Sequence, residues 1–319
     1  MSPRGTVLAA VLLAIASGCM KKDGMGPLEG VLIVFPDGGE SAASAFSDSL
    51  QKFVNTVYAE PVFSFSFVPA GSFTGDLRRY RTIVLVTGEG AGYPALPGGL
   101  SMCGTFMGGR DVWATGQRVF AAEPGSTDIR ALSDSLESAY EEHLLAYIYQ
   151  SFVSTQMSSP ERMDSLASLG FVMDVPKAYE TTEWDPGRGF VQFQRRVDEE
   201  GLIMISIRWL DSDSVPTAEE AVGWRQEMAR RFFYDASADS VDRARLSVSP
   251  CSISGARGWE LVGAWRNPEH VNAGAFASYV LQAGSRRYIL DAEVYNPGEE
   301  KELYIREGRL IMKTFVPEG

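Results

Sequence analysis

Hydrophobic residues in the first half of the chain follow two different periods. Continuous or alternating apolar runs at 30–35, 62–68 and 82–87 predict β-strands. From Ser41 to Val57, apolar residues recur every three or four positions, which predicts an amphipathic helix. The order strand, helix, strand, strand indicates an α/β-like first lobe.

A second helical pattern, from about Thr127 to Met157, separates the two halves of the chain. Its apolar residues keep helical spacing, and a Ser-Ser-Pro sequence would end it. The preceding stretch 88–110 is rich in glycine and predicts a long loop, a feature that is often functional in a compact domain. We therefore assign residues 30–158 to a first lobe and residues 159–319 to a second.

The second half has the pattern of a mainly antiparallel β-structure. Thr217 and Glu220 have the spacing of a capping box that opens a helix, and a closing helix is expected from about Glu299 to Phe315. The chain is thus predicted to have an α+β fold, with helices covering an antiparallel sheet in the second lobe. The expected strands of this lobe lie at 171–176, 189–196, 201–210, 244–252, 257–265, 274–283 and 286–295.

The apolar segment from Thr6 to Ala16 is too short to cross a membrane. A helix of this length reaches about 16 Å, whereas a bilayer core is about 30 Å thick. Arg4 precedes the segment and small residues close it, which is typical of a secretory signal with its cleavage site. We interpret residues 1–18 as a signal peptide that is removed.

The residues AlaSerGlyCys at 16–19 resemble the lipobox of bacterial lipoproteins. The resemblance implies that Cys19 becomes the first mature residue and carries acyl chains such as palmitate, which together give stable anchoring. Met20 follows instead of an aspartate, which implies the outer membrane and its periplasmic face. Residues 19–29 would then form the lipidated N-terminus and a flexible tether. The alternative is a secreted protein in which this cysteine is incidental.

The charge and the other cysteines restrict the partners and the covalent links. With 29 Lys and Arg against 41 Asp and Glu, the formal net charge is −12, so we expect no nucleic-acid partner. The two remaining cysteines are Cys103 and Cys251. In an oxidising compartment they could form a disulfide between the halves, and two separately buried thiols are the alternative.

The sequence offers few residues for catalysis. It contains two histidines, His143 and His270, and it has neither a GxSxG nucleophile motif nor a nucleotide-binding fingerprint. His143 is expected on a solvated helix face, while His270, in a loop between strands, could orient a serine. We predict no catalytic residues, no metal ligands, no cofactor and no enzyme activity.

Five of the six tryptophans lie in the second half. Most are expected in the core, but Trp184 lies in a polar segment and is expected to be exposed in a turn between strands. Trp184 and His270 are therefore the candidates for a binding surface. The partner could be an envelope protein, a peptide, a glycan or a lipid, in addition to the membrane that the lipid anchor contacts.

The segment 259–315 contains Glu260, Gly263, Trp265, the turn AlaGlyAlaPhe at 273–276, Tyr295 and Pro297. With these residues it resembles the closing segment of a lipoprotein family known as domain of unknown function 4837, although that family usually has GlyGlyProPhe at the turn. Segments 111–120 and 170–179 resemble other parts of the family. Because the family has no established activity, the resemblance implies no catalytic residues. The order of elements in the second half is also similar to the Mog1/PsbP-like fold of binding and assembly proteins.

Three functions follow from these observations. The first is a non-enzymatic envelope lipoprotein that binds or scaffolds another component. The second is an envelope hydrolase that uses His270, which requires a serine or carboxylate within reach in a deep pocket. The third is small-ligand binding in a cleft between the lobes, lined by the loop 88–110.

Overall fold

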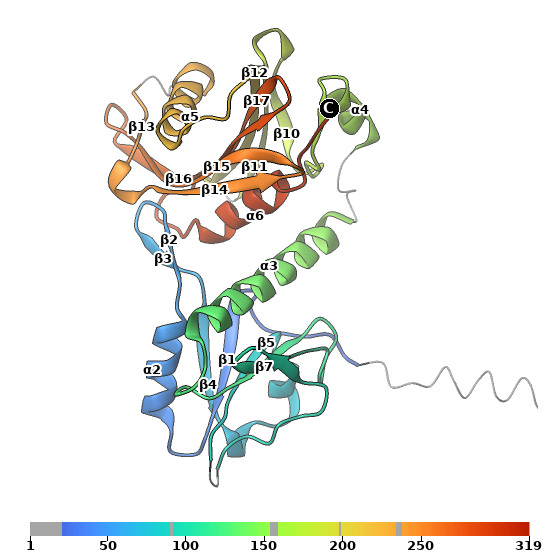
Figure 1. The fold of residues 1–319 in the computed structure, drawn as a ribbon, viewed down its shortest axis with the longest axis vertical. Coiled ribbons are helices and arrows are strands. Elements are labelled where there is room, and N and C mark those ends of the chain that lie inside the picture. The colour runs from blue at the N-terminus through green and yellow to red at the C-terminus, as the bar shows by residue number, and fades with distance from the viewer. Residues whose placement is uncertain (1–20, 90–91, 154–158, 198, 234–237, 319) are drawn as a thin grey trace, which may run out of the picture. The chain divides into compact units, whose positions relative to one another are not determined.

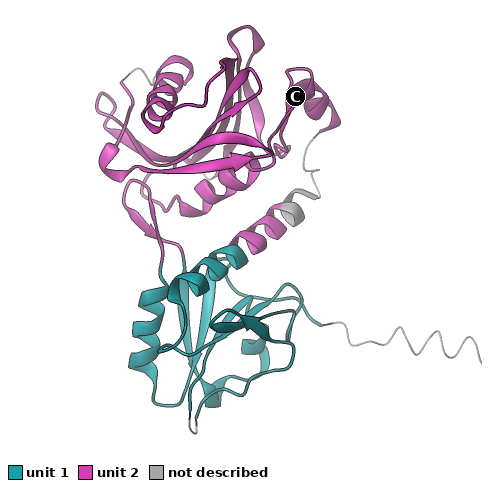
Figure 2. Ribbon diagram, in the orientation of Figure 1, with its two compact units in different colours: residues 1–51, 63–140 teal, residues 52–62, 141–319 magenta. Residues whose placement is uncertain are grey.

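The computed structural model describes residues 21–89, 92–153, 159–197, 199–233 and 238–318. The chain forms two compact units (Figure 2): unit 1 contains residues 1–51 and 63–140, and unit 2 contains residues 52–62 and 141–319. The predicted α+β class, with an α/β-like first part and an antiparallel second part, is confirmed. Among the helices described, none is both long enough and apolar enough to cross a bilayer.

Unit 1 is built on a six-stranded mixed sheet (Figure 1). Its first four strands run parallel, and the last two add antiparallel to the edge. The central strands are apolar throughout and buried on both faces, as expected for a parallel sheet. In spatial order the strands are β4 (Ser64–Pro69), β1 (Gly30–Phe35), β5 (Thr82–Val86), β8 (Arg118–Ala122), β7 (Phe106–Arg110) and β6 (Ser101–Cys103).

Two segments of this unit differ from the sequence prediction. The helix expected from Ser41 to Val57 is α2 (Glu40–Leu50), which is shorter than predicted. At Gln51 the chain leaves the helix, and the Gln51 side chain forms hydrogen bonds with the backbone of Phe63. The stretch 88–110, expected to be a loop, ends in the hairpin β6–β7. Helix α3 (Ile129–Val153) confirms the long helical pattern and continues from unit 1 into unit 2.

Residues 22–25, which the sequence assigned to a flexible tether, are hydrogen-bonded to unit 1. The backbone N–H of Gly24 donates to the carbonyl of Thr115 at 2.8 Å, and that of Met25 donates to Arg79 at 2.8 Å. Isolated β-bridges pair the same segment with Thr115 and Tyr80. This part of the segment therefore belongs to the folded unit.

Unit 2 contains an eight-stranded antiparallel sheet. The long strands lie close to their predicted positions. The prediction did not include β10 or the short β13, and the strand predicted at 171–176 is only the two-residue β9. In spatial order the strands are β10 (Glu180–Asp185), β11 (Phe190–Arg196), β12 (Leu202–Asp211), β17 (Arg286–Tyr295), β16 (Asn272–Ala283), β15 (Ala256–Asn267) and β13 (Ser240–Val241), and β14 (Ser247–Ile253) also pairs with β15.

Helices cover both faces of this sheet. Helix α5 (Ala218–Phe232) packs on one face through a cluster that includes Met228 and Val280, and the predicted capping box of Thr217 and Glu220 opens it. Helices α4 (Pro160–Ala167) and α6 (Glu302–Met312) pack on the other face. The remaining short elements are β9 (Phe171–Val172) paired with β18 (Val316–Pro317), β2 (Phe53–Asn55) paired with β3 (Ala59–Pro61), and the 3₁₀ turns at 70–72, 75–79, 186–188 and 243–245.

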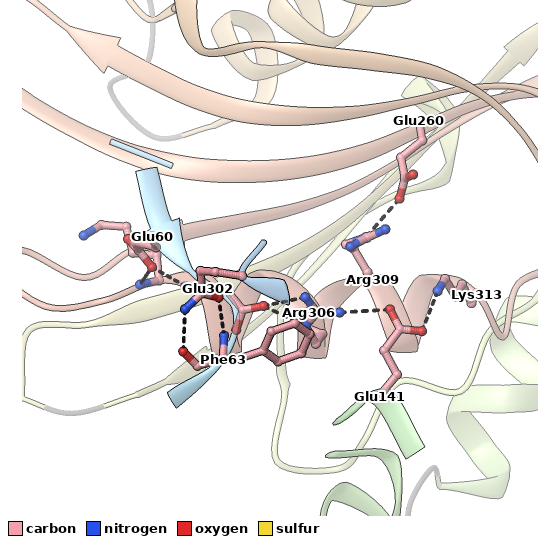
Figure 3. Close-up of polar contacts among 10 residues, drawn as sticks. Glu60, Phe63, Glu141, Glu260, Glu302, Arg306, Arg309 and Lys313 are labelled. Carbon is pink, nitrogen blue, oxygen red and sulfur yellow. Dashed lines mark hydrogen bonds and ion pairs between the residues drawn. The ribbon is translucent and has the colours of Figure 1, made fainter. Parts of the chain in front are cut away.

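The hairpin β2–β3 caps the start of helix α6 within unit 2 (Figure 3). The fully buried carboxylate of Glu60 accepts the backbone N–H groups of Lys301 at 2.7 Å and Glu302 at 2.6 Å. These are N–H groups at a helix N-terminus, which have no partner inside the helix and which the helix dipole makes favourable for an anion. The hairpin thus supplies the cap that the local sequence of α6 does not.

A balanced set of charges lies beside α6, and we call it the α6 cluster (Figure 3). It consists of Glu302 and Arg306 on α6, Lys313 directly after α6, and Glu141 on α3. Arg306 is buried and pairs with Glu302 at 2.6 Å and with Glu141 at 3.1 Å. Lys313 also pairs with Glu141, at 3.2 Å. Each carboxylate therefore has a cation, so the cluster is neutral without a ligand.

Candidate functional site

Strand β17 carries two acidic residues into the interior of unit 2. It lies between β12 and β16, and its residues from Arg287 to Val294 are buried on both faces of the strand. Leu290 and Ala292 alternate toward the core under α6, while Asp291 and Glu293 point to the side covered by α5. Asp291 is fully buried and Glu293 is 3% exposed. Burying two carboxylates on one strand face requires compensation by charge or by protons.

One guanidinium group, from helix α5, forms ion pairs with both carboxylates. Arg225 is 1% exposed, and its Nε donates to Asp291 Oδ1 at 3.0 Å while Nη2 donates to Glu293 Oε2 at 2.5 Å. Its guanidinium also lies over the ring of Phe276, 3.9 Å from the centroid. The Ser278 hydroxyl donates a short hydrogen bond to Asp291. Asp291 is thus fully occupied, and Glu293 has one charged partner.

A third buried carboxyl group lies beside this pair. Asp239, just before β13, is 4% exposed and accepts a hydrogen bond from Asn267 Nδ2 at 2.7 Å. The Asn267 side-chain oxygen accepts the backbone N–H groups of Glu269 at 3.0 Å and His270 at 3.1 Å. One amide therefore orients both Asp239 and the loop that carries His270. We call Arg225, Asp239, Asp291 and Glu293 the β17 cluster.

Next to the β17 cluster is a cavity of about 480 Å³ that lies wholly within unit 2. Glu293 and Asp239 reach its wall, and the strand register places Met204 directly beside Glu293. Three aromatic side chains, Leu202 and Met204 share the rest of the wall with three amide side chains and His270. The lining residues are Gln194, Leu202, Met204, Phe233, Asp239, Trp265, Asn267, His270, Asn272, Glu293 and Tyr295.

Burial dominates the electrostatics of the cavity wall. It raises the pKa of Glu293 to about 8, against the attraction of Arg225 and with further repulsion from Asp291 and Asp239. Burial also raises the pKa of Asp239, a shift that the hydrogen bond from Asn267 opposes. Burial lowers the pKa of Arg225, but the neighbouring carboxylates outweigh this and leave it raised, so the guanidinium stays charged. The ligand-free site therefore holds a proton on Glu293 at neutral pH.

Two polar atoms on lining residues lack partners. The indole Nε1 of Trp265, a residue that is only 5% exposed, and the Oδ1 of Asn272 are buried without a hydrogen-bond partner among the described residues. Gly274 explains the position of the indole, because a Cβ at that residue would lie 2.7 Å from Trp265 Nε1. Both atoms are buried behind the cavity surface, where buried polar groups are normally satisfied.

The structure separates the two residues that the sequence singled out for binding. His270 is exposed and lies at the cavity, which Asp239 and Glu293 also line. Trp184 is 41% exposed, as predicted, but it lies within strand β10 rather than in a turn, and it does not line the cavity. His270 thus belongs to the candidate site and Trp184 does not.

The other singled-out residues fall outside this site. Cys103 is exposed and Cys251 is half-buried, and both are free thiols; they lie in different units, and their pairing stays a prediction. His143 is buried, which corrects the expectation of a solvated position. Cys19 and the signal peptide 1–18 lie outside the described residues, so lipidation also stays a prediction.

The sequence analysis missed the residues that define the cavity. Glu293 and Asp291 stand at alternate positions of a strand whose other residues are mostly apolar, and such a pattern marks buried acids on a central strand. Arg225 lies on the buried side of a predicted helix together with Ala221 and Met228. Pairing this arginine with those acids required the tertiary structure. Within the described part of the chain, no group of three or more His, Cys, Asp or Glu is placed to hold a metal ion.

A family comparison identifies the part of the chain that contains this cavity. Residues 159–314 match the family model of DUF4837, a domain of unknown function. The resemblance predicted from the sequence is therefore confirmed for this segment. Of the residues that carried it, Trp265 and Tyr295 line the cavity, and the turn at 273–276 contains Gly274 beneath the indole. The DUF4837 segment thus includes every residue of the β17 cluster.

No curated protein matches the chain. A crystal structure from Bacteroides thetaiotaomicron has a TM-score of 0.28 at 14% identity, covering 47% of this chain and 46% of that one, so the match spans about half of its length. LpqN of Mycobacterium tuberculosis, described as involved in cell envelope biogenesis, has a TM-score of 0.29 at 10% identity, covering 46% and 83%. Cyanobacterial PsbP from Synechocystis has a TM-score of 0.32 at 10% identity, covering 47% and 88%.

Proposed function

We propose that this protein is an envelope lipoprotein, anchored through Cys19 at the periplasmic face of the outer membrane, whose unit 2 binds a small organic ligand without catalysing a reaction. The lipobox-like sequence at 16–19 and the short apolar segment before it support the anchor. The DUF4837 segment supports assignment to a family without established activity.

The cavity in unit 2 is the observation that carries the binding function. Its volume of about 480 Å³ lies in the range of small-molecule sites, about 300–1,000 Å³. Its wall combines apolar surface with a few convergent polar groups, which is the usual composition of such sites. None of the lining residues is a serine or a cysteine, so the described wall lacks the serine that the hydrolase alternative would pair with His270.

Extraction of bound small molecules tests the binding function. Protein purified from native envelopes is denatured, and the released molecules are quantified by mass spectrometry against the Met204→Trp variant, whose larger side chain fills the cavity. The control is Met102→Trp, at an exposed position in unit 1. We expect one molecule to be enriched several-fold in the wild type and in the control. Equal amounts in all three proteins would contradict the proposal.

Substitution of Cys19 tests the anchor. Cys19→Ser removes the only thiol that the lipobox-like sequence offers for acylation. We expect labelled palmitate to be incorporated into the wild type and into the Cys103→Ser control, and to be absent from Cys19→Ser, with the variant leaving the membrane fraction. Palmitate on the Cys19→Ser protein would contradict the anchor and leave the ligand-binding part of the proposal intact.

A further inference from the structure

The buried charges around the cavity do not cancel. The β17 cluster places three carboxyl groups against one buried guanidinium, that of Arg225. Arg230 is the nearest additional cation to Asp239, and its side chain is exposed and donates to the backbone carbonyl of that residue at 2.7 Å. Uncompensated carboxylates in a poorly solvated site must either take up protons or attract a cation. The pKa of Glu293, which burial raises to about 8, means that a proton on this carboxyl group serves the purpose at neutral pH.

The walls of the cavity suit an organic cation better than a metal ion. Phe233, Trp265 and Tyr295 are aromatic, and the Trp265 and Tyr295 rings lie 6.4 Å apart with a tilt of 31°. Aromatic faces attract ammonium groups and accept their methyl or methylene surface. Calcium, by contrast, takes six to eight oxygen ligands, and much of this wall is the carbon of residues such as Leu202 and Met204.

We propose that the cavity of unit 2 binds an organic ammonium ion, with Glu293 and Asp239 as the counter-charges and the aromatic residues Trp265, Tyr295 and Phe233 around the cationic group. The inference rests on the proposed ligand-binding function and adds the chemical class of the ligand. Such an ammonium group occurs in free amino alcohols and in the headgroups of amino-alcohol phospholipids.

Binding of this cation is coupled to proton release. The ligand replaces the proton on Glu293, so its affinity should rise with pH up to about 8 and level off above it. The rise should approach tenfold for each pH unit well below that value, because each pKa unit corresponds to a factor of ten in the binding constant. The charged or titratable groups that face Glu293 are Arg225 from α5, Asp291 and Tyr295 from its own strand, Asp239 before β13, and His270 from the loop after β15.

Calorimetric titration of the full chain with choline tests the proposal. The matched probe is neohexyl alcohol, in which a carbon atom replaces the choline nitrogen, so shape is kept and charge is lost. We expect choline to bind at least tenfold more tightly than neohexyl alcohol at pH 8, with proton release seen as a dependence of the heat on the buffer. Equal affinities for the two probes, or choline affinity that does not change between pH 6 and 8, would overturn the proposal.

Variants place the effect at the cavity. Glu293→Gln keeps the shape of the side chain and should lower choline affinity at least tenfold and remove the proton release. Tyr295→Leu leaves the β17 cluster intact and replaces the first variant if that variant does not fold. It should lower the affinity for choline more than the affinity for neohexyl alcohol. His270→Gln should leave the dependence on pH in place. A choline affinity that neither Glu293→Gln nor Tyr295→Leu lowers would overturn the proposal.

Two further comparisons identify the source of the ligand and show whether a negative result contradicts the ligand class alone or the binding function as well. Short-chain phosphatidylcholine that competes with choline would identify a lipid headgroup, and choline binding without such competition would identify a free amino alcohol. If the extraction experiment yields a neutral or anionic molecule and choline does not bind, the proposed ligand class fails and the binding function stands. If no molecule is enriched and no probe binds, both fail.

Discussion

The α6 cluster and the β17 cluster are both sets of charges around a buried arginine in unit 2, but their charges are balanced differently. In the α6 cluster, the two cations Arg306 and Lys313 balance the two carboxylates of Glu302 and Glu141. In the β17 cluster, Arg225 faces three carboxyl groups, and a cavity lies next to the excess. A balanced cluster is complete without a ligand, whereas an unbalanced one beside a cavity has a place for a cation.

Removal of the central arginine of each cluster should give the largest difference in unfolding free energy between the two clusters. Arg225→Met leaves Asp291, Glu293 and Asp239 without a buried cation, and we expect a loss of about 3–5 kcal/mol in unfolding free energy, or failure to fold. Arg306→Met should cost less, about 2 kcal/mol, because Glu141 keeps Lys313 as a partner. Urea unfolding at pH 8 measures both. A larger loss for Arg306→Met would contradict the comparison.

Removal of the Glu60 cap should have an intermediate effect. Glu60→Gln keeps the size of the side chain but replaces one acceptor oxygen by an amide group that cannot accept the backbone N–H groups of Lys301 and Glu302. We expect a loss of about 1–3 kcal/mol in unfolding free energy. Glu40→Gln, at the exposed start of α2, is the control and should change stability by less than about 0.5 kcal/mol. Equal effects of the two substitutions would show that the β2–β3 hairpin does not stabilise α6.

The excess charge of the β17 cluster should also appear as a dependence of stability on pH. The pKa of Glu293 is raised in the folded state, so the native protein binds more protons than the unfolded chain between about pH 4.5 and 8. Stability should therefore fall as pH rises through this window and become constant above about 8. Glu293→Gln should remove the fall that Glu293 causes, with a difference in slope of up to about 1.4 kcal/mol per pH unit. Parallel pH profiles of unfolding free energy for the wild type and the variant would contradict this expectation.

Trp184→Ala is expected to have the smallest effect. The side chain is 41% exposed on β10 and lies outside the cavity. We expect a change of less than about 1 kcal/mol in unfolding free energy, because partly exposed positions lose little buried area. Choline affinity should be unchanged in the same variant. A loss of choline binding would show that the ligand site extends to β10.

The sequence predicted the fold where residues act through local periodicity. The apolar run at β1, the capping box of α5 and the long apolar strands of unit 2 lie where the spacing indicated. The prediction was wrong where a distant contact decides the structure. The predicted helix after Ser41 ends at Leu50, and the side chain of Gln51, the next residue, bonds to the backbone of Phe63.

The sequence could not predict the candidate site, because this site also depends on contacts between residues that are far apart in the chain. His270, which the sequence analysis singled out because a histidine in a loop is visible in the sequence, lines the candidate cavity. The excess charge depends on Arg225, Asp239 and Glu293, which come from three separate elements. Only the packing of α5 on the sheet brings them together and buries them, and burial is what changes their protonation.

Direct titration of the Glu293 carboxyl group tests the central claim that this cavity holds an excess of buried negative charge for a cationic ligand. Carbon NMR of glutamate-labelled protein, with the signal assigned by Glu293→Gln, gives the titration midpoint with and without choline. We predict a midpoint near 8 in the free protein, raised by burial, and a lower midpoint when choline is bound. A midpoint at the ordinary value of a glutamate, unchanged by choline, would contradict the account.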